Sequence, residues 1–201
     1  MRVRRYEASH LAPEDKKKTF WSEYGYLLVT VVVVFVLFRV IFQLAWVPSG
    51  SMENTIPTKS LLFSLRLPYL VGDPALERGD VVTFQSDALG KLLVKRVIGL
   101  PGEEISFEDG YVCGDGSRIA ELYLATQGVT NSRGGESFRV PEGCYFMMGD
   151  NRTGSDDSRF WDEPYVSETD IRAKVLVIVS VHEDNSWRGV RPVSWQGGSK
   201  N

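Results

Sequence analysis

A long apolar run near the N-terminus constrains this chain more than any other part of its sequence. Residues 24–38 carry no charge, and residues 40–47 continue the run after the single Arg39. Fifteen residues of helix rise only about 22 Å, short of a hydrocarbon core of about 30 Å, so a membrane span needs the helix to continue to Val47. Arg39 can then extend its guanidinium to the lipid headgroups.

A buried core helix and a cleaved signal peptide are the two alternatives to a retained membrane anchor. A core helix of nearly continuous valine is unexpected in so small a domain. The small residues of a signal-peptide cleavage site are missing from Phe42-Gln43-Leu44 and from Trp46-Val47-Pro48. Aromatic residues stand near both ends of the run, as in interfacial belts. We therefore expect a transmembrane anchor over residues 21–47.

The distribution of charge predicts the orientation of this anchor in the membrane. The first 20 residues hold six basic and three acidic residues, whereas the whole chain holds 23 basic and 26 acidic residues, so the remainder is acidic. Basic residues before a span favour a cytoplasmic N-terminus. We expect residues 1–20 to be a basic cytoplasmic segment and the domain after the anchor to be extracytoplasmic. The acidic remainder argues against nucleic acid as a partner.

The rest of the 201-residue chain has room for one domain, and its pattern is of the β type. Short runs rich in β-branched and aromatic residues alternate with clusters of Gly, Pro and Asp, and no helical period of useful length is present. The runs are residues 61–67, 80–85, 92–99, 104–107, 111–113, 145–148 and 173–181. The expected fold is mainly β, one coiled antiparallel sheet or partial barrel over residues 48–184. Residues 127–137 are expected to form a surface loop, and residues 185–201 a polar tail.

Two serines follow the apolar run in the turn-rich stretch WVPSGSMENT, residues 46–55. Pro48 and Gly50 flank Ser49, and Ser51 comes next, which predicts a rigid loop. A serine hydroxyl is a poor nucleophile until a neighbouring base activates it. The stretch by itself leaves an ordinary turn open beside a catalytic one.

Lys95 is the candidate base. Strand alternation in KLLVKRVIGLPGE, residues 91–103, places Leu93, Lys95 and Val97 on one face. Lys95 therefore either faces water at a sheet edge or is buried, and burial lowers a lysine pKa from its reference of about 10.4. A neutral amine can accept the proton of a serine hydroxyl, and neither histidine of the chain is well placed to do so. This favours a pair of Ser51 and Lys95.

A polar stretch, GDNRTGSDDSRFW, occupies residues 149–161 between apolar residues. It is either a solvated turn or an interior polar network. In the second interpretation Asp157 and Arg159 form an ion pair, and Ser155 turns toward the amine and orients it.

The spacing of the two cysteines does not indicate a metal site. Cys113 and Cys144 would both be exported, so a disulfide between them is permitted but not required. Their spacing does not match a metal motif, and His10 and His182 are the only histidines, which leaves no plausible zinc site. We expect neither metal nor organic cofactor.

Four segments together resemble bacterial type I signal peptidase, a membrane-bound Ser/Lys endopeptidase that removes signal peptides from exported preproteins. They are PSGSM at 48–52, RGDVVTF at 78–84, KRVIGLPGE at 95–103, and GDNR with SDDSR within 149–159. The resemblance covers the chain from the anchor to about residue 181 and is to the smaller, single-anchor forms of the family. It implies the corresponding β-fold, no cofactor, and cleavage after an Ala-x-Ala-type site.

The resemblance also implies a role for individual residues. Ser51 is the expected nucleophile and Lys95 its general base, with Ser49 and the Ser51 amide forming the oxyanion hole. The resemblance also implies supporting residues: Ser155 hydrogen-bonds the lysine, and Asp157 and Arg159 form an ion pair. Met52 is expected at the edge of the substrate pocket.

The chain departs from the family pattern at two places. Asn54 stands where many members have proline, and Thr153-Gly154 stands where an Asp-Asn pair is usual. Neither departure falls on an expected catalytic residue, so they bear on the rigidity of the loops. The expected partners are signal-peptide-bearing preproteins and the lipid bilayer of the cell membrane, with the protein acting as a single-pass monomer.

Two other functions compete with this one. A self-cleaving repressor-type peptidase also pairs Ser with Lys on a related β-fold, but would carry a soluble DNA-binding segment in place of the apolar run. A catalytically silent, membrane-anchored β-domain could instead bind export clients. The presence of every expected catalytic residue argues against the silent domain.

Overall fold

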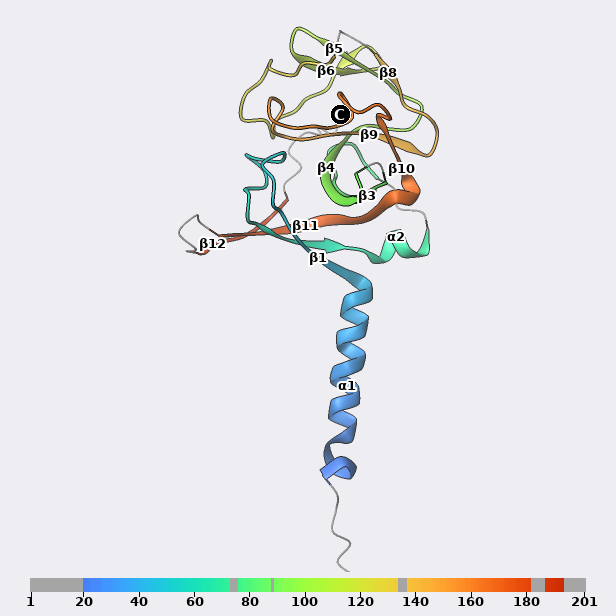
Figure 1. The fold of residues 1–201 in the computed structure, drawn as a ribbon, viewed down its shortest axis with the longest axis vertical. Helices are drawn as coiled ribbons and strands as arrows, with labels where there is room; N and C mark the ends of the chain where they lie inside the picture. Colours follow the sequence, from blue (N-terminus) through green and yellow to red (C-terminus); the bar gives the residue numbers. More distant parts are fainter. Residues whose placement is uncertain (1–19, 73–75, 88, 134–136, 182–186, 194–201) are drawn as a thin grey trace, which may run out of the picture. The chain divides into compact units, whose positions relative to one another are not determined.

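The computed structural model describes residues 20–72, 76–87, 89–133, 137–181 and 187–193 (Figure 1). Contacts divide the chain into two compact units, Met1–Leu37 and Phe38–Asn201. The first unit contains most of one helix, and the second contains the strands. The expected cytoplasmic segment, residues 1–20, lies almost wholly outside the described residues.

Helix α1, Phe20–Ile41, is the expected apolar helix, but its limits differ from the expectation. It begins at Phe20, so its 22 residues rise about 33 Å, enough for a hydrocarbon core without the extension to Val47. By length and composition, Tyr24–Ile41 could cross a membrane.

The helix ends at Ile41 because the next residues pair with a sheet. Strand β1, Phe42–Trp46, runs antiparallel to β2, Leu61–Leu65. The ring of Phe42 stacks on Phe63 at a centroid distance of 4.7 Å, and the Ile41 carbonyl accepts a hydrogen bond from the Arg66 N–H at 2.8 Å. Tertiary pairing therefore overrides the apolar pattern that predicted helix as far as Val47.

Two antiparallel sheets form the second unit, which confirms the expected mainly β fold. The larger sheet has the order β1-β2-β11-β3-β4-β9-β10, with β12 paired to β11. Its further strands are β3 (Val81–Ser86), β4 (Lys91–Gly99), β9 (Cys144–Met148), β10 (Tyr165–Ser167), β11 (Ile171–Val181) and β12 (Trp187–Pro192). The smaller sheet has the order β7-β6-β5-β8, with β5 (Glu104–Glu108), β6 (Tyr111–Gly114), β7 (Ser117–Arg118) and β8 (Phe138–Arg139). All seven expected strands are present.

Two elements were not predicted from the sequence. Strand β12 lies in the segment that was expected to be a polar tail, and it pairs with β11 from Pro192 to Trp187. A short helix, α2 (Leu67–Val71), follows β2, with proline in its first turn. Its five residues are too few to produce a helical period, and a proline at that position is compatible with a helix start.

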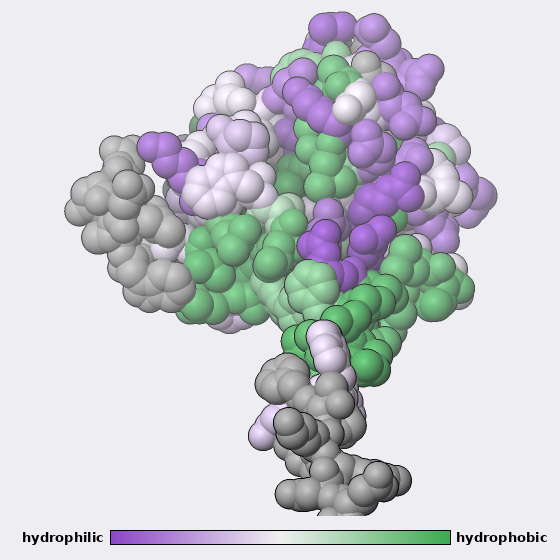
Figure 2. Space-filling model, turned by 60° about the horizontal axis from the view of Figure 1, so that its bottom comes forward, coloured by the Kyte–Doolittle hydropathy of each residue, from purple (hydrophilic) through white to green (hydrophobic). Residues whose placement is uncertain are grey.

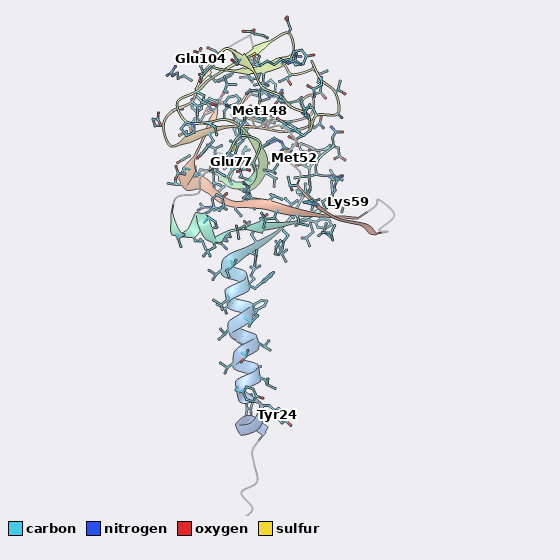
Figure 3. All side chains as sticks on the ribbon, turned by 180° about the vertical axis from the view of Figure 1, so that it is seen from behind. Tyr24, Met52, Lys59, Glu77, Glu104 and Met148 are labelled. Carbon is cyan, nitrogen blue, oxygen red and sulfur yellow. The ribbon has the colours of Figure 1, made fainter. Side chains whose placement is uncertain are left out.

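Three apolar clusters form the core of the strand unit. One lies around Val82, Val97 and Met147, a second around Met52, Leu62 and Val81, and a third around Ile98, Ile105 and Phe146. Figure 3 labels Met52 and Met148, which are buried in the second and third clusters. Consecutive residues of β4 contribute to different clusters, so this strand runs through the middle of the core.

Both cysteines are free thiols. Cys113 is buried on β6, and Cys144 is half-buried at the start of β9. Burial raises the pKa of each thiol. Buried thiols of this kind behave as small apolar side chains rather than as reactive groups.

Candidate active site

Ser51 lies on a closed loop between β1 and β2. The Val47 N–H donates to the Ser60 carbonyl at 3.0 Å, and the Lys59 N–H donates to the Val47 carbonyl at 2.8 Å, which joins the two ends of the loop. The Met52 side chain is buried and anchors the loop from within. Ser51 is half-buried beside this anchor, and Ser49 is exposed.

The side chain of Lys95 is buried and does not face water. It stands opposite Val82 of β3, and only 2% of its surface is accessible. Its Nζ donates a hydrogen bond of 2.7 Å to Ser155 Oγ. Burial lowers the pKa of Lys95 to about 8, although the negative charges of Asp157 and Asp156 act in the opposite direction. Roughly a tenth of such amines are neutral at pH 7.

Asp157 and Arg159 form the expected ion pair. Arg159 donates from Nε to Asp157 Oδ1 at 2.8 Å and from Nη2 to Oδ2 at 2.9 Å, and both side chains are inaccessible to solvent. Burial alone would raise the pKa of Asp157, but the bonds and charge of Arg159 and the N–H of Gly149 hold it below its usual value. The carboxylate therefore stays ionised while its charge is balanced, which limits its effect on Lys95.

Gly149 is the point where the Ser51 loop meets the Lys95 site. A Cβ atom at Gly149 would lie 2.1 Å from Ser155 Oγ and 2.4 Å from the Ser51 carbonyl oxygen. The serine that bonds Lys95 and the main chain of Ser51 thus lie on either side of one glycine. No hydrogen bond joins Ser51 Oγ to Lys95 Nζ within the described part of the chain. Catalytic hydrogen bonds are often long before substrate binds.

Two further buried ion pairs hold the turn that follows Gly149. Arg96 donates from Nε and Nη2 to the two carboxylate oxygens of Asp150, at 2.8 and 2.6 Å. Arg152 binds both carboxylate oxygens of Glu121, and Tyr123 donates to Glu121 at 2.7 Å. Side-chain exposure is at most 3% in both pairs. Neither pair was singled out from the sequence, and together they fix the turn in the protein interior.

Comparison with known proteins identifies the family. The family model described as "Signal peptidase, peptidase S26" matches residues 21–180, which is most of the chain. The chain belongs to the signal peptidase family. It is therefore a serine peptidase, as expected, and the resemblance inferred from its four segments is confirmed.

Individual relatives agree with this family. A probable signal peptidase I-2 of Synechocystis is 33% identical over 74% of this chain and 69% of its own length. The signal peptidase I of Bacillus amyloliquefaciens is 35% identical over 75% of this chain and 81% of its own length. A solved signal peptidase I from Enterococcus faecalis is 32% identical and covers 51% of this chain and 98% of its own chain, with a TM-score of 0.44.

The geometry separates the expected site residues of this signal peptidase family member into two groups. Lys95, Ser155, Asp157 and Arg159 are in one connected network of hydrogen bonds and charges. Ser49, Ser51 and Met52 share the neighbouring loop, with Met52 packed in the core. Among the described residues, no group of His, Cys, Asp and Glu side chains could hold a metal ion. His10 and His182 lie outside the described residues.

Replacing Gly149 by alanine is expected to lower kcat by about 100-fold or more, because the new methyl group would displace Ser155 or the Ser51 carbonyl. Overpacking of this kind also destabilises by about 1–3 kcal/mol. Steady-state kinetics and thermal unfolding in detergent measure both effects. Gly25→Ala is the matched control, since a Cβ there has nothing within 4 Å. Wild-type activity of Gly149→Ala would show that the two serines are not packed against this residue.

Proposed function

We propose that this protein removes signal peptides from exported preproteins by cutting after an Ala-x-Ala-type site, with Ser51 as nucleophile and Lys95 as general base. The observation that carries the proposal is the buried Lys95 amine, bonded at 2.7 Å to Ser155 beside the Ser51 loop. A buried lysine without a carboxylate in direct contact is costly to keep charged, and its neutral form is a competent base.

The first half of the reaction forms an acyl-enzyme. Lys95 Nζ takes the proton from Ser51 Oγ, and this oxygen attacks the carbonyl carbon of the scissile bond. The negative oxygen that forms accepts hydrogen bonds from the Ser51 N–H and the Ser49 hydroxyl. When the C–N bond breaks, Lys95 returns its proton to the leaving amine, which becomes the N-terminus of the mature protein.

The second half releases the signal peptide from Ser51. Lys95 is neutral again after the first half and takes a proton from water, whose oxygen attacks the ester carbonyl. Lys95 then protonates Ser51 Oγ as the ester bond breaks. Ser155 keeps the amine in place throughout by accepting one of its N–H bonds, so a lone pair stays directed at the reacting oxygen.

The open edge of β4 is the proposed binding place for the substrate. Strand β3 pairs with β4 from Lys91 to Arg96, whereas β9 pairs on the other edge only from Arg96 onward. The backbone groups just before Lys95 are thus left for an extended peptide, which would bind as an added strand. Small side chains at the first and third positions before the cut would face the enzyme, and Met52, on the Ser51 loop, would lie at the edge of the pocket that receives them.

The membrane arrangement is part of the same proposal. Helix α1 would cross the cell membrane with the N-terminus in the cytoplasm and the strand unit outside. Figure 2 shows apolar side chains gathered on the side of the molecule that comes forward in that view. Trp46 on β1 and Val71 on α2 are 57% and 75% exposed, and these apolar side chains would rest on lipid. Enzyme and precursor would then share one bilayer, which raises their effective concentration, and a monomer would suffice.

The test is cleavage of an Ala-x-Ala precursor by the detergent-purified full-length protein, with the cut located by mass spectrometry. The wild type is expected to cut after the second alanine, and Ser51→Ala to yield no product above background. A precursor with leucine in place of the second alanine is the substrate control and should remain uncut. A Ser51→Ala variant that cuts normally would remove Ser51 from the nucleophile's role, and an inert wild type would favour a silent binding domain.

A further inference from the structure

Asn151 binds the nucleophile loop through both its main chain and its side chain. Its N–H donates to the Ser51 carbonyl at 3.1 Å, and its Nδ2 donates to the Gly50 carbonyl at 3.0 Å. The other end of the amide, Oδ1, accepts the Gly154 N–H at 3.1 Å, which fixes the orientation of the carboxamide. The side chain of Asn151 thus bridges its own turn and the loop that carries Ser51.

The bond to Gly50 acts on the peptide group of Ser51. The carbonyl of Gly50 and the N–H of Ser51 belong to one planar unit and point in opposite directions, so holding the oxygen also aims the N–H. The Gly50 carbonyl accepts a second bond, from the Glu53 N–H at 3.0 Å. Two donors on one oxygen leave the plane of this peptide little freedom to rotate, and they polarise its N–H.

The turn that presents Asn151 is itself immobilised from both sides. Asp150 before it and Arg152 after it are each held in a buried ion pair, with Arg96 and Glu121 respectively. Positioning to within about 0.5 Å needs a support of this kind, because an exposed side chain alone would move too freely.

Gly154 leaves the space that the Asn151 side chain occupies. A Cβ at residue 154 would lie 2.7 Å from Asn151 Nδ2 and 3.1 Å from its Cγ and Oδ1. Gly154 is not among the glycines with a left-handed backbone, so the requirement is for space and not for conformation. The departure from the usual Asp-Asn pair at 153–154 therefore lies where the Asn151 carboxamide packs against Gly154 and accepts its N–H.

We propose that Asn151 is a positioning residue that aims the Ser51 N–H at the oxygen that becomes negative during the reaction, and that this role depends on glycine at 154. The inference rests on the proposed role of Ser51. Its effect should be on the chemical step, since Asn151 touches the nucleophile loop and makes no hydrogen bond to Lys95, Ser155 or Asp157.

Asn151→Ala is expected to lower kcat by about 10- to 100-fold, with KM within about threefold of wild type, because a misplacement of about 1 Å can cost about 100-fold in rate. Asn151→Asp should be at least as slow, since it keeps an acceptor for Gly154 but sets an oxygen against the Gly50 carbonyl. Thr153→Ala is the control: its hydroxyl meets only the oxygen end of the amide, at 3.4 Å, and activity should stay within about threefold.

The pH profile separates this role from a general loosening of the site. Asn151→Ala should lower the rate by the same factor at every pH and leave the midpoint of kcat/KM where it is in the wild type. Ser155→Ala should move that midpoint, because Ser155 touches the Lys95 amine.

A double-mutant cycle tests the dependence on glycine. Gly154→Ala should cost about tenfold or more in kcat in the wild type, but less than about threefold in the Asn151→Ala background, where the new methyl group takes the vacated space. Equal costs in both backgrounds would overturn the coupling. If Asn151→Ala has wild-type kcat while Ser51→Ala is inactive, only the positioning role of Asn151 is overturned. If Ser51→Ala is active, the proposed function, on which this inference rests, is overturned.

Discussion

Lys95→Ala is expected to lower kcat by on the order of 10⁴-fold or more, because it removes the proposed general base for Ser51. Lys95→Arg should be equally inactive. A guanidinium keeps the positive charge but does not lose its proton in the accessible pH range, so this variant separates proton acceptance from charge. Single-turnover cleavage of a precursor, with product detected by mass, has the range to measure both losses.

The wild-type profile should rise with pH and level off, with a midpoint in kcat/KM near the Lys95 pKa of about 8. The direction follows from the chemistry: the amine is active when neutral, and its neutral fraction increases about tenfold for each unit of pH below its pKa. A profile that falls through this range, or a Lys95→Arg variant with wild-type activity, would contradict Lys95 as the base.

Asp150→Ala is expected to destabilise the protein by about 3–5 kcal/mol, because it leaves the Arg96 guanidinium buried without its anion. Arg96 would keep the Gly79 carbonyl at 2.6 Å and the ring of Tyr123 at 3.9 Å, and neither carries a compensating charge. Such a loss is a large part of the stability of a typical domain. Denaturant unfolding of the full chain in detergent, followed by tryptophan fluorescence, measures it.

Lys174→Ala supplies a milder comparison. Lys174 also pairs with an aspartate, Asp80, at 2.6 Å, but 36% of the Lys174 side chain and 9% of the Asp80 side chain are exposed, and Asp80 also accepts the Glu77 N–H. It should cost less than Asp150→Ala, because solvent reaches and screens this pair more than the pair at Arg96. Replacing both members of the buried pair, Arg96→Met with Asp150→Leu, should cost less than Asp150→Ala, since no charge is left unpaired. Equal stability of Asp150→Ala and Lys174→Ala would show that the pair at Arg96 is solvated.

The strands that the sequence predicts are those whose own residues are alternately or continuously apolar. β4 and β11 alternate or are continuously apolar, so their existence follows from local residues. β1 and β12 depend on partners instead: β1 resembles the end of the apolar helix and becomes a strand on β2, and β12 is polar and becomes a strand on β11. Pairing between distant segments is not visible in a local pattern.

The network at Lys95 could be predicted from residue types and the family resemblance, whereas the two other ion pairs could not. A signal for Arg96 was nevertheless present, because it alternates with Val94 and Ile98 just as Lys95 alternates with Leu93 and Val97. Its partner Asp150 is 54 residues away, and Glu121 stands in a segment without regular pattern. Which charges are buried together depends on the tertiary fold.

Strand β4 is paired along only part of its edge toward β9, and this bears on the position at which a precursor would be cut. Pairing with β9 begins at Arg96, one residue after the proposed base, so a substrate peptide bound along the unpaired part of this edge would be aligned with the Lys95 amine by main-chain hydrogen bonds. Side chains in such a peptide alternate, and a slip of one residue turns a different set toward the enzyme. In the proposed binding mode, two small residues spaced two apart would therefore set the register of the precursor on β4 and with it the position of the cut.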